Sequence, residues 1–177
     1  MQFTDDELAA RLKQPGPQWF EGTDLSQANL SGAYLHLANL HGANLTGANL
    51  SKADLSEANL EEADLSKASL QDAKLRNAYL IGAILSETDL SEANLEGANL
   101  SRAKLQEAIL YAANLLDARL IGANLIDATL IGADLRGATL LRANLSGANL
   151  SEARYNKDTK WPDYFDPVVA GAIKVNL

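Results

Sequence analysis

The 177-residue sequence contains no cysteine, which excludes a disulfide framework, a thiol nucleophile and a cysteine metal site. Aromatic residues make up 6% of the chain, and His36 and His41 are its two histidines. No apolar run approaches the length of a membrane span. The first residues, MQFTDDELAARLK, carry acids where a secretory signal carries bases. We therefore expect a soluble protein with a cytoplasmic location.

Leucine is abundant and strictly spaced, since every multiple of five from Leu25 to Leu150 is leucine. On an α-helix, leucines five residues apart are rotated by about 140° and cover the whole surface instead of one stripe. On a flat strand they alternate between the two faces. The spacing therefore predicts a chain that turns by a fixed angle every five residues, so that all leucines point toward a common axis. Such a chain is a solenoid.

The residues around each leucine repeat as well. Two positions before each leucine from Leu30 to Leu150 stands alanine, with Thr88 as the one substitute. Residues two apart face the same side of an extended segment, so each alanine and its leucine should both face inward. The residue between them is most often Asn or Asp, which satisfies local backbone groups and tolerates turns. The units ANLSG, ADLSE and ANLTG resemble the pentapeptide repeat, A(D/N)LXX.

This resemblance implies an all-β solenoid, a right-handed quadrilateral parallel β-helix in which four pentapeptides make one coil. The chain is similar to the plain cyanobacterial members of the bacterial pentapeptide-repeat family. Its length then corresponds to roughly 6 to 7 coils of about 20 residues. We expect an N-terminal capping helix and linker over residues 1–22, the β-helix over 23–155 and a C-terminal cap over 156–177.

Both ends of the column should be covered, because repeat proteins need capping units. Thr4 and Glu7 have the spacing of a capping box, which predicts a short helix from about Asp5 to Gln14, ended by Pro15. The segment ARYNKDTKWPDYFDP abandons the repeat and resembles the terminal segment that follows many pentapeptide arrays. A binding site is the alternative role for its aromatic residues. The expected cap residues are Phe3, Leu8, Leu12, Trp19, Phe20, Trp161, Tyr164 and Phe165.

The position directly after each leucine is polar through most of the N-terminal half and becomes apolar in the C-terminal half. In a four-sided coil, residues 116, 121, 126 and 131 would form an apolar collar around one level of the column. Clusters of exposed apolar side chains mark contact surfaces, whereas the preference of isoleucine for extended segments is the alternative explanation. The candidate interface is Ile109, Tyr111, Leu116, Ile121, Ile126, Ile131 and Leu141.

The coil from Ser69 to Thr88 has neither Asn nor Asp directly before its leucines, because Ser69, Lys74, Tyr79 and Ile84 stand there. This interruption of the polar pattern indicates a seam between two shorter arrays, a slight bend or a harmless variation.

The net charge of −8 has the sign of DNA. Some family members are thought to bind DNA gyrase by imitating duplex DNA. Glu87, Glu107 and Asp127 are twenty residues apart and should stack as an acidic face. From residue 26 to residue 150, however, 14 acids and 9 bases leave a net charge of −5. About 31 Å of duplex DNA, the expected length of the column, carries about 18 charges.

We therefore expect a non-enzymatic, rigid protein-interaction scaffold, with an inhibitor or protector of DNA gyrase or topoisomerase that acts as a DNA mimic as the alternative. His36 and His41 should lie outward without convergent partners, so no catalytic, cofactor-binding or metal-binding residues are predicted. The protein partner is unidentified from the sequence, and a homodimer through the C-terminal end is an assembly that the resemblance implies. Direct contact with nucleic acid or a membrane is not expected.

Overall fold

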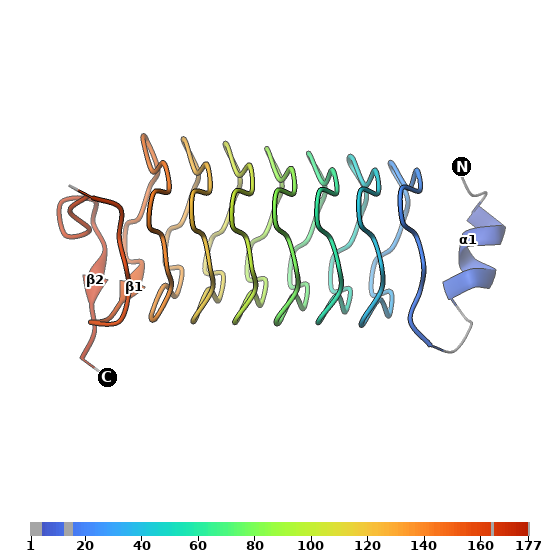
Figure 1. The fold of residues 1–177 in the computed structure, drawn as a ribbon, viewed down its shortest axis with the longest axis horizontal. Helices are drawn as coiled ribbons and strands as arrows, with labels where there is room; N and C mark the ends of the chain where they lie inside the picture. The colour runs from blue at the N-terminus through green and yellow to red at the C-terminus, as the bar shows by residue number, and fades with distance from the viewer. Residues whose placement is uncertain (1–4, 13–15, 164, 177) are drawn as a thin grey trace.

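The structure is a computed structural model that describes residues 5–12, 16–163 and 165–176. Figure 1 shows a straight column of stacked coils with helix α1 (Asp5–Leu12) at one end. Strands β1 (Arg154–Tyr155) and β2 (Ile173–Lys174) pair in parallel at the other end. Within the described ranges, no helix is both long and apolar enough to cross a membrane.

A constant register of twenty residues holds the coils together. Parallel bridges run from Trp19↔Asn39 to Asp134↔Arg154 at this separation. At each bridge the hydrogen bonds follow one scheme: Leu25 N–H donates to the Asn44 carbonyl at 2.7 Å, and Asn44 N–H donates to the Thr23 carbonyl at 2.9 Å. Each five-residue unit supplies one bridge and one turn, so each coil has four sides and four corners.

We name each side by the first outward residue of its ladder. The Trp19 side continues through residues 39, 59, 79 and onward in steps of twenty, and the Asp24, Asn29 and Tyr34 sides follow in the same way. Because the chain visits the sides in this order, the Trp19 side lies opposite the Asn29 side. The ladders pass without a break through Ser69, Lys74, Tyr79 and Ile84. The coil from Ser69 to Thr88 is therefore no seam between separate arrays.

The core is a continuous column of leucine and alanine. Leu95 and Ala98 are fully buried, as are nearly all leucines and alanines in the corresponding positions of other coils. This confirms that both members of the Ala-x-Leu pair face inward. Thr88, in an alanine position, is also fully buried, and Thr159 is buried near the C-terminal end.

Every corner is a turn with a left-handed residue at its second inner position. Ala28 N–H donates to the Leu25 carbonyl at 3.1 Å, and Gln27 between them has φ of 60°. Asn and Asp residues stabilise these corners by accepting a backbone hydrogen bond. The Asp24 carboxylate, for example, accepts one of 3.1 Å from Ser26 N–H. The same bond recurs in most coils, which confirms the role expected for the Asn/Asp position.

Helix α1 covers the first coil through Leu8, which is buried, and Leu12, which packs against the core. Arg11 connects the helix to the column: its Nη2 donates to the Trp19 carbonyl at 2.9 Å, and its guanidinium lies 5.4 Å from the centroid of the buried Phe20 ring. The expectation for Trp19 was wrong, because its side chain is 64% exposed on the outside of the column. Phe20 occupies the inward leucine register, so the preceding residue must point outward.

Helix α1 is described as far as Leu12, and the expected helix end at Gln14 lies outside the described residues. Phe3, Thr4 and Pro15 lie outside the described residues, as do Lys13 and Gln14.

At the C-terminal end the register changes to twenty-one residues at Thr139↔Lys160, and β2 then pairs with β1. Trp161 packs edge-on against Tyr155 at 5.6 Å between ring centroids and stacks on Phe165 at 5.2 Å. Tyr164 lies outside the described residues.

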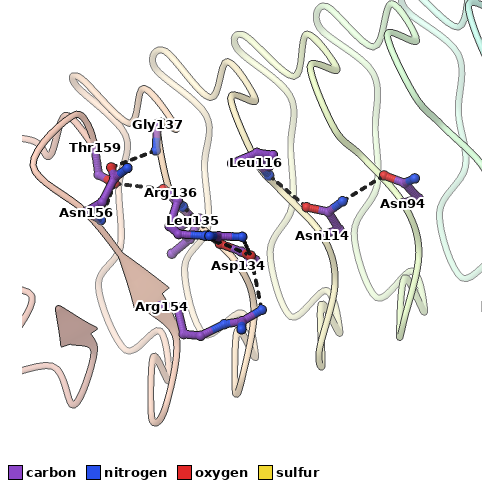
Figure 2. Close-up of polar contacts among 10 residues, drawn as sticks. All are labelled: Asn94, Asn114, Leu116, Asp134, Leu135, Arg136, Gly137, Arg154, Asn156 and Thr159. Atoms are coloured by element: carbon purple, nitrogen blue, oxygen red, sulfur yellow. Dashed lines mark hydrogen bonds and ion pairs between the residues drawn. The ribbon is translucent and has the colours of Figure 1, made fainter. Parts of the chain in front are cut away.

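An ion-pair cluster on the Tyr34 side joins the last coils. As Figure 2 shows, Arg136 lies against the Asp134 carboxylate, with Nη2 at 2.7 Å from Oδ2, while Arg154 reaches the same oxygen at 3.1 Å from the next coil. Burial by itself raises the pKa of Asp134, but the hydrogen bonds from Arg136 and the charges of both arginines outweigh it and lower the pKa.

Candidate interaction surface

The Asn29 side carries the best-exposed part of the candidate interface. Ile109 takes the outward ladder position there and is 41% exposed, and Tyr111 at the adjoining corner is 49% exposed. Ile131 lies one coil further at the same corner and is half-buried. Ala112, next to Tyr111, is exposed as well. These four residues form what we call the Ile109 patch.

The acidic face borders the same side at its other corner. Glu87, Glu107 and Asp127 are exposed and follow one another in the twenty-residue register. Lys67 lies one coil before Glu87 at this corner, with Nζ 3.6 Å from the Glu87 carboxylate. The structure therefore places the acidic residues and the Ile109 patch on the two corners of one side, with one end of the acidic row paired to a base.

Asp89 adds to the negative charge of this side, directly before Ile109 in the ladder. Burial raises the pKa of Asp89, but hydrogen bonds from the side chain and backbone of Ser91 and from Gln71 outweigh it and lower the pKa.

The remaining candidates do not join this patch. Of the four collar residues, Ile131 belongs to the patch, whereas Leu116, Ile121 and Ile126 lie at the other three corners of the same coil, and all four are half-buried. Leu141 is 40% exposed and lies one coil beyond Ile121, at the corner between the Trp19 side and the Asp24 side. The collar is thus distributed around the column and presents no single face to a partner.

A groove on the Trp19 side was not expected from the sequence. It has a volume of about 410 Å³ and lies between Trp19 and Tyr79, with Asn39 and Asn59 between these aromatic residues in the ladder. Leu37 and Glu57 line one edge, and Glu61 lines the other. The signal was present in the sequence, because residues sixty apart share a side when the coil has twenty residues.

No group of three or more histidine, cysteine or acidic side chains in the described ranges is arranged to hold a metal ion.

Comparison with known families identifies the repeat. The model described as "Pentapeptide repeats" matches in 8 copies, over residues 20–51, 43–82, 73–110, 83–120 and 113–152. The chain therefore belongs to the pentapeptide-repeat family. Together with the similar solved structures, this membership implies that the four-sided column is a right-handed quadrilateral β-helix.

Among solved structures, the chain is similar to QnrB1, a plasmid-mediated fluoroquinolone resistance protein, with 25% identity and a TM-score of 0.80 over 89% of this chain and 80% of that one. It is 31% identical to HetL from Nostoc sp. strain PCC 7120, a protein involved in heterocyst differentiation regulation, over 95% and 90% of the two chains, with a TM-score of 0.30. It is 36% identical to alr5209 from Nostoc PCC 7120 over 55% and 84%, with a TM-score of 0.32. The search of curated proteins gives no match.

Proposed function

We propose that this protein is a rigid, non-enzymatic scaffold for protein–protein interaction and that it contacts its partner through the Ile109 patch. The observation that carries the proposal is the exposure of Ile109 and Tyr111, at 41% and 49%, on the side that the acidic residues border. Exposed apolar side chains that adjoin one another, with a polar rim, are characteristic of protein contact surfaces.

The column supports this surface. Ile109 lies between bridges to Asp89 and Thr129, and its N–H donates to the Thr88 carbonyl at 3.0 Å. A patch held on such a backbone loses little conformational freedom on binding, which favours affinity. The acidic corner with Glu107 and Asp127 favours a partner whose contact surface is apolar with a basic edge.

Site-specific photo-crosslinking tests this proposal. A photoreactive amino acid replaces Tyr111 in one variant. In a control variant it replaces Tyr34, which is 62% exposed on the Tyr34 side, next to the Asn29 side. In an extract of the source organism, we expect a discrete crosslinked protein from position 111 and none from position 34. The product should disappear when Ile109→Asp is added. Identical products from both positions, or a product that survives Ile109→Asp, would contradict the proposal.

A homodimer through the C-terminal end is compatible with this scaffold, because it leaves the Asn29 side free. Val168, Val169 and Ile173 are 65%, 85% and 50% exposed there. Light scattering over a wide concentration range tests the assembly. We expect a parent dimer that Val169→Asp converts to a monomer and that Ile109→Asp leaves intact. A monomeric parent at all concentrations would exclude this assembly.

The second candidate function is a DNA mimic directed at DNA gyrase. It is favoured by the row Glu87, Glu107 and Asp127 and by the likeness to QnrB1. The pairing of Lys67 with Glu87 weakens it, since it reduces the negative charge at one end of the row. Inhibition of gyrase supercoiling at low micromolar protein, lost in a Glu107→Lys, Asp127→Lys variant and kept in Ile109→Asp, would establish it over the first candidate.

A further inference from the structure

The groove on the Trp19 side is bounded by two exposed aromatic rings. Trp19 and Tyr79 are 64% and 50% exposed, and bridges connect them through Asn39 and Asn59. Three coil steps of about 4.8 Å separate the two aromatic residues by about 14 Å along the column axis. The short asparagines between them leave the groove of about 410 Å³.

Leu37 on one edge of the groove has no evident role in the fold. Its φ is 59°, and among the described non-glycine residues with positive φ it is the one large apolar residue. Its side chain is nevertheless 47% exposed. Leucine is unfavourable here both for the backbone and for solvation, because the left-handed region disfavours residues with a Cβ and water disfavours its side chain. A contact that covers Leu37 would offset part of this cost.

The groove is acidic. Glu57 and Glu61 lie on opposite edges of the coil that carries Asn59, and neither takes part in an ion pair within the described part of the chain. Arg76 is a base on the same edge as Glu57, and it pairs with Glu96 at 3.2 Å. Near Trp19, the Glu21 carboxylate accepts a 3.1 Å hydrogen bond from Asn39 Nδ2. Glu57 and Glu61 thus line the groove together with Tyr79, while Glu21 is two residues from Trp19 and is bonded to a residue of the groove.

We propose that this groove binds a basic segment of another protein in extended conformation, running along the column axis. One arginine or lysine side chain lies on the ring of Trp19 near Glu21, and a second lies on Tyr79 near Glu57 and Glu61. Cations bind the faces of aromatic rings, and the carboxylates strengthen the attraction. Leu37 contacts the aliphatic part of the segment, and Asn59 Nδ2 on the floor donates to its backbone.

The distance between the two rings sets a spacing in the partner. An extended chain rises about 3.4 Å per residue, so about 14 Å corresponds to two basic residues four positions apart. The site is on the opposite side of the column from the Ile109 patch and does not depend on the function proposed for that patch.

Fluorescence anisotropy with labelled synthetic peptides tests the site. The probe peptide carries two arginines four positions apart in a Gly/Ser background, and a second peptide of equal composition carries them adjacent. We expect saturable binding of the probe peptide, about fivefold weaker binding of the adjacent-arginine peptide, and about fivefold weaker binding of the probe to either Trp19→Ala or Tyr79→Ala. Tyr34→Ala removes an equally exposed ring on another side and should leave binding unchanged.

Charge is tested separately with Glu57→Gln, Glu61→Gln, which should weaken binding of the probe about tenfold. The matched control Glu92→Gln, Glu152→Gln removes two exposed acids from a different corner and should have no effect. The Ile109→Asp variant should bind the probe like the parent, which separates failure of this site from failure of the Ile109 patch. No saturable binding, equal binding of both peptides, or equal losses in test and control variants would overturn the proposal.

Discussion

Thr88 Oγ1 donates a 2.7 Å hydrogen bond to the carbonyl oxygen of Leu65, in the preceding coil. Thr159 makes the equivalent bond to the Leu135 carbonyl at 2.9 Å. Both threonines are buried in the column, and a buried hydroxyl is tolerated when it is hydrogen-bonded. The carbonyl of the leucine, which already accepts the corner hydrogen bond from Ala68 N–H, supplies that acceptor. A threonine can therefore replace alanine in this core.

The first prediction concerns this bond. Thr88→Val keeps the shape of the side chain but removes the donor, and it should lower the free energy of unfolding by about 1 kcal/mol. Thr129→Val changes a half-buried threonine on the outside of the Asn29 side and should be nearly neutral. Chemical denaturation measures both variants. Equal stability of Thr88→Val and the parent would show that the bond contributes nothing.

The second prediction concerns packing at the middle of the column. Leu95→Ala should cost about 2 to 5 kcal/mol, because the coils on either side are held by the ladders and cannot collapse into the cavity. Ala98→Leu should cost about 1 to 3 kcal/mol through overpacking. Both residues are fully buried. Thermal and chemical denaturation provide the measurement.

Arg102→Lys is the control for these core variants, because it changes an exposed corner residue and should alter stability by less than about 0.5 kcal/mol. Core variants that unfold together with this control would show that the interior is loosely packed.

The third prediction separates backbone strain from packing at two adjacent alanines. Ala112 has φ of 52° at an exposed corner, so Ala112→Gly should stabilise the protein by about 0.5 to 1 kcal/mol. Ala113 is fully buried, and Ala113→Gly should destabilise by about 1 kcal/mol. Opposite signs in the unfolding free energies are the diagnostic result.

The reverse change, Gly132→Ala, lies one coil further at the same corner as Ala112. Gly132 has φ of 68°, and a Cβ there would meet no atom within 4 Å, so its cost should be that of the backbone alone, about 1 kcal/mol. A neutral Gly132→Ala would contradict the assignment of strain to these corners.

The fourth prediction is a pH dependence centred on Asp134. Its pKa is lowered in the folded state, so its contribution to stability is present above the ordinary pKa of 3.8 and is lost as the pH falls through the lower folded value. Asp134→Asn should therefore reduce stability at neutral pH and weaken its decrease on acidification below about pH 4. Urea titrations at several pH values provide the test, and identical profiles for Asp134→Asn and the parent would contradict it.

The repeating unit and its inward residues follow from the five-residue pattern alone. A leucine every five residues with alanine two positions before it is compatible with a coil that turns at fixed intervals, and the buried Leu95 and Ala98 confirm the assignment. The same rule extends to Phe20, which takes a multiple of five. Trp19 does not belong to the cap, because it directly precedes the inward-facing Phe20 and therefore points outward.

Which outward residues share a surface depends on how the coils stack on one another. Five-residue spacing does not state how many units make a coil, whereas the observed bridges separate partners by twenty residues. That register brings Trp19 to the same groove as Tyr79 and sets Ile109 beside the acidic row, while it distributes Leu116 and Ile121 to other corners. Local alternation along the chain decides which side chains enter the core. Hydrogen bonding between coils, by contrast, decides which outward residues become neighbours on the surface.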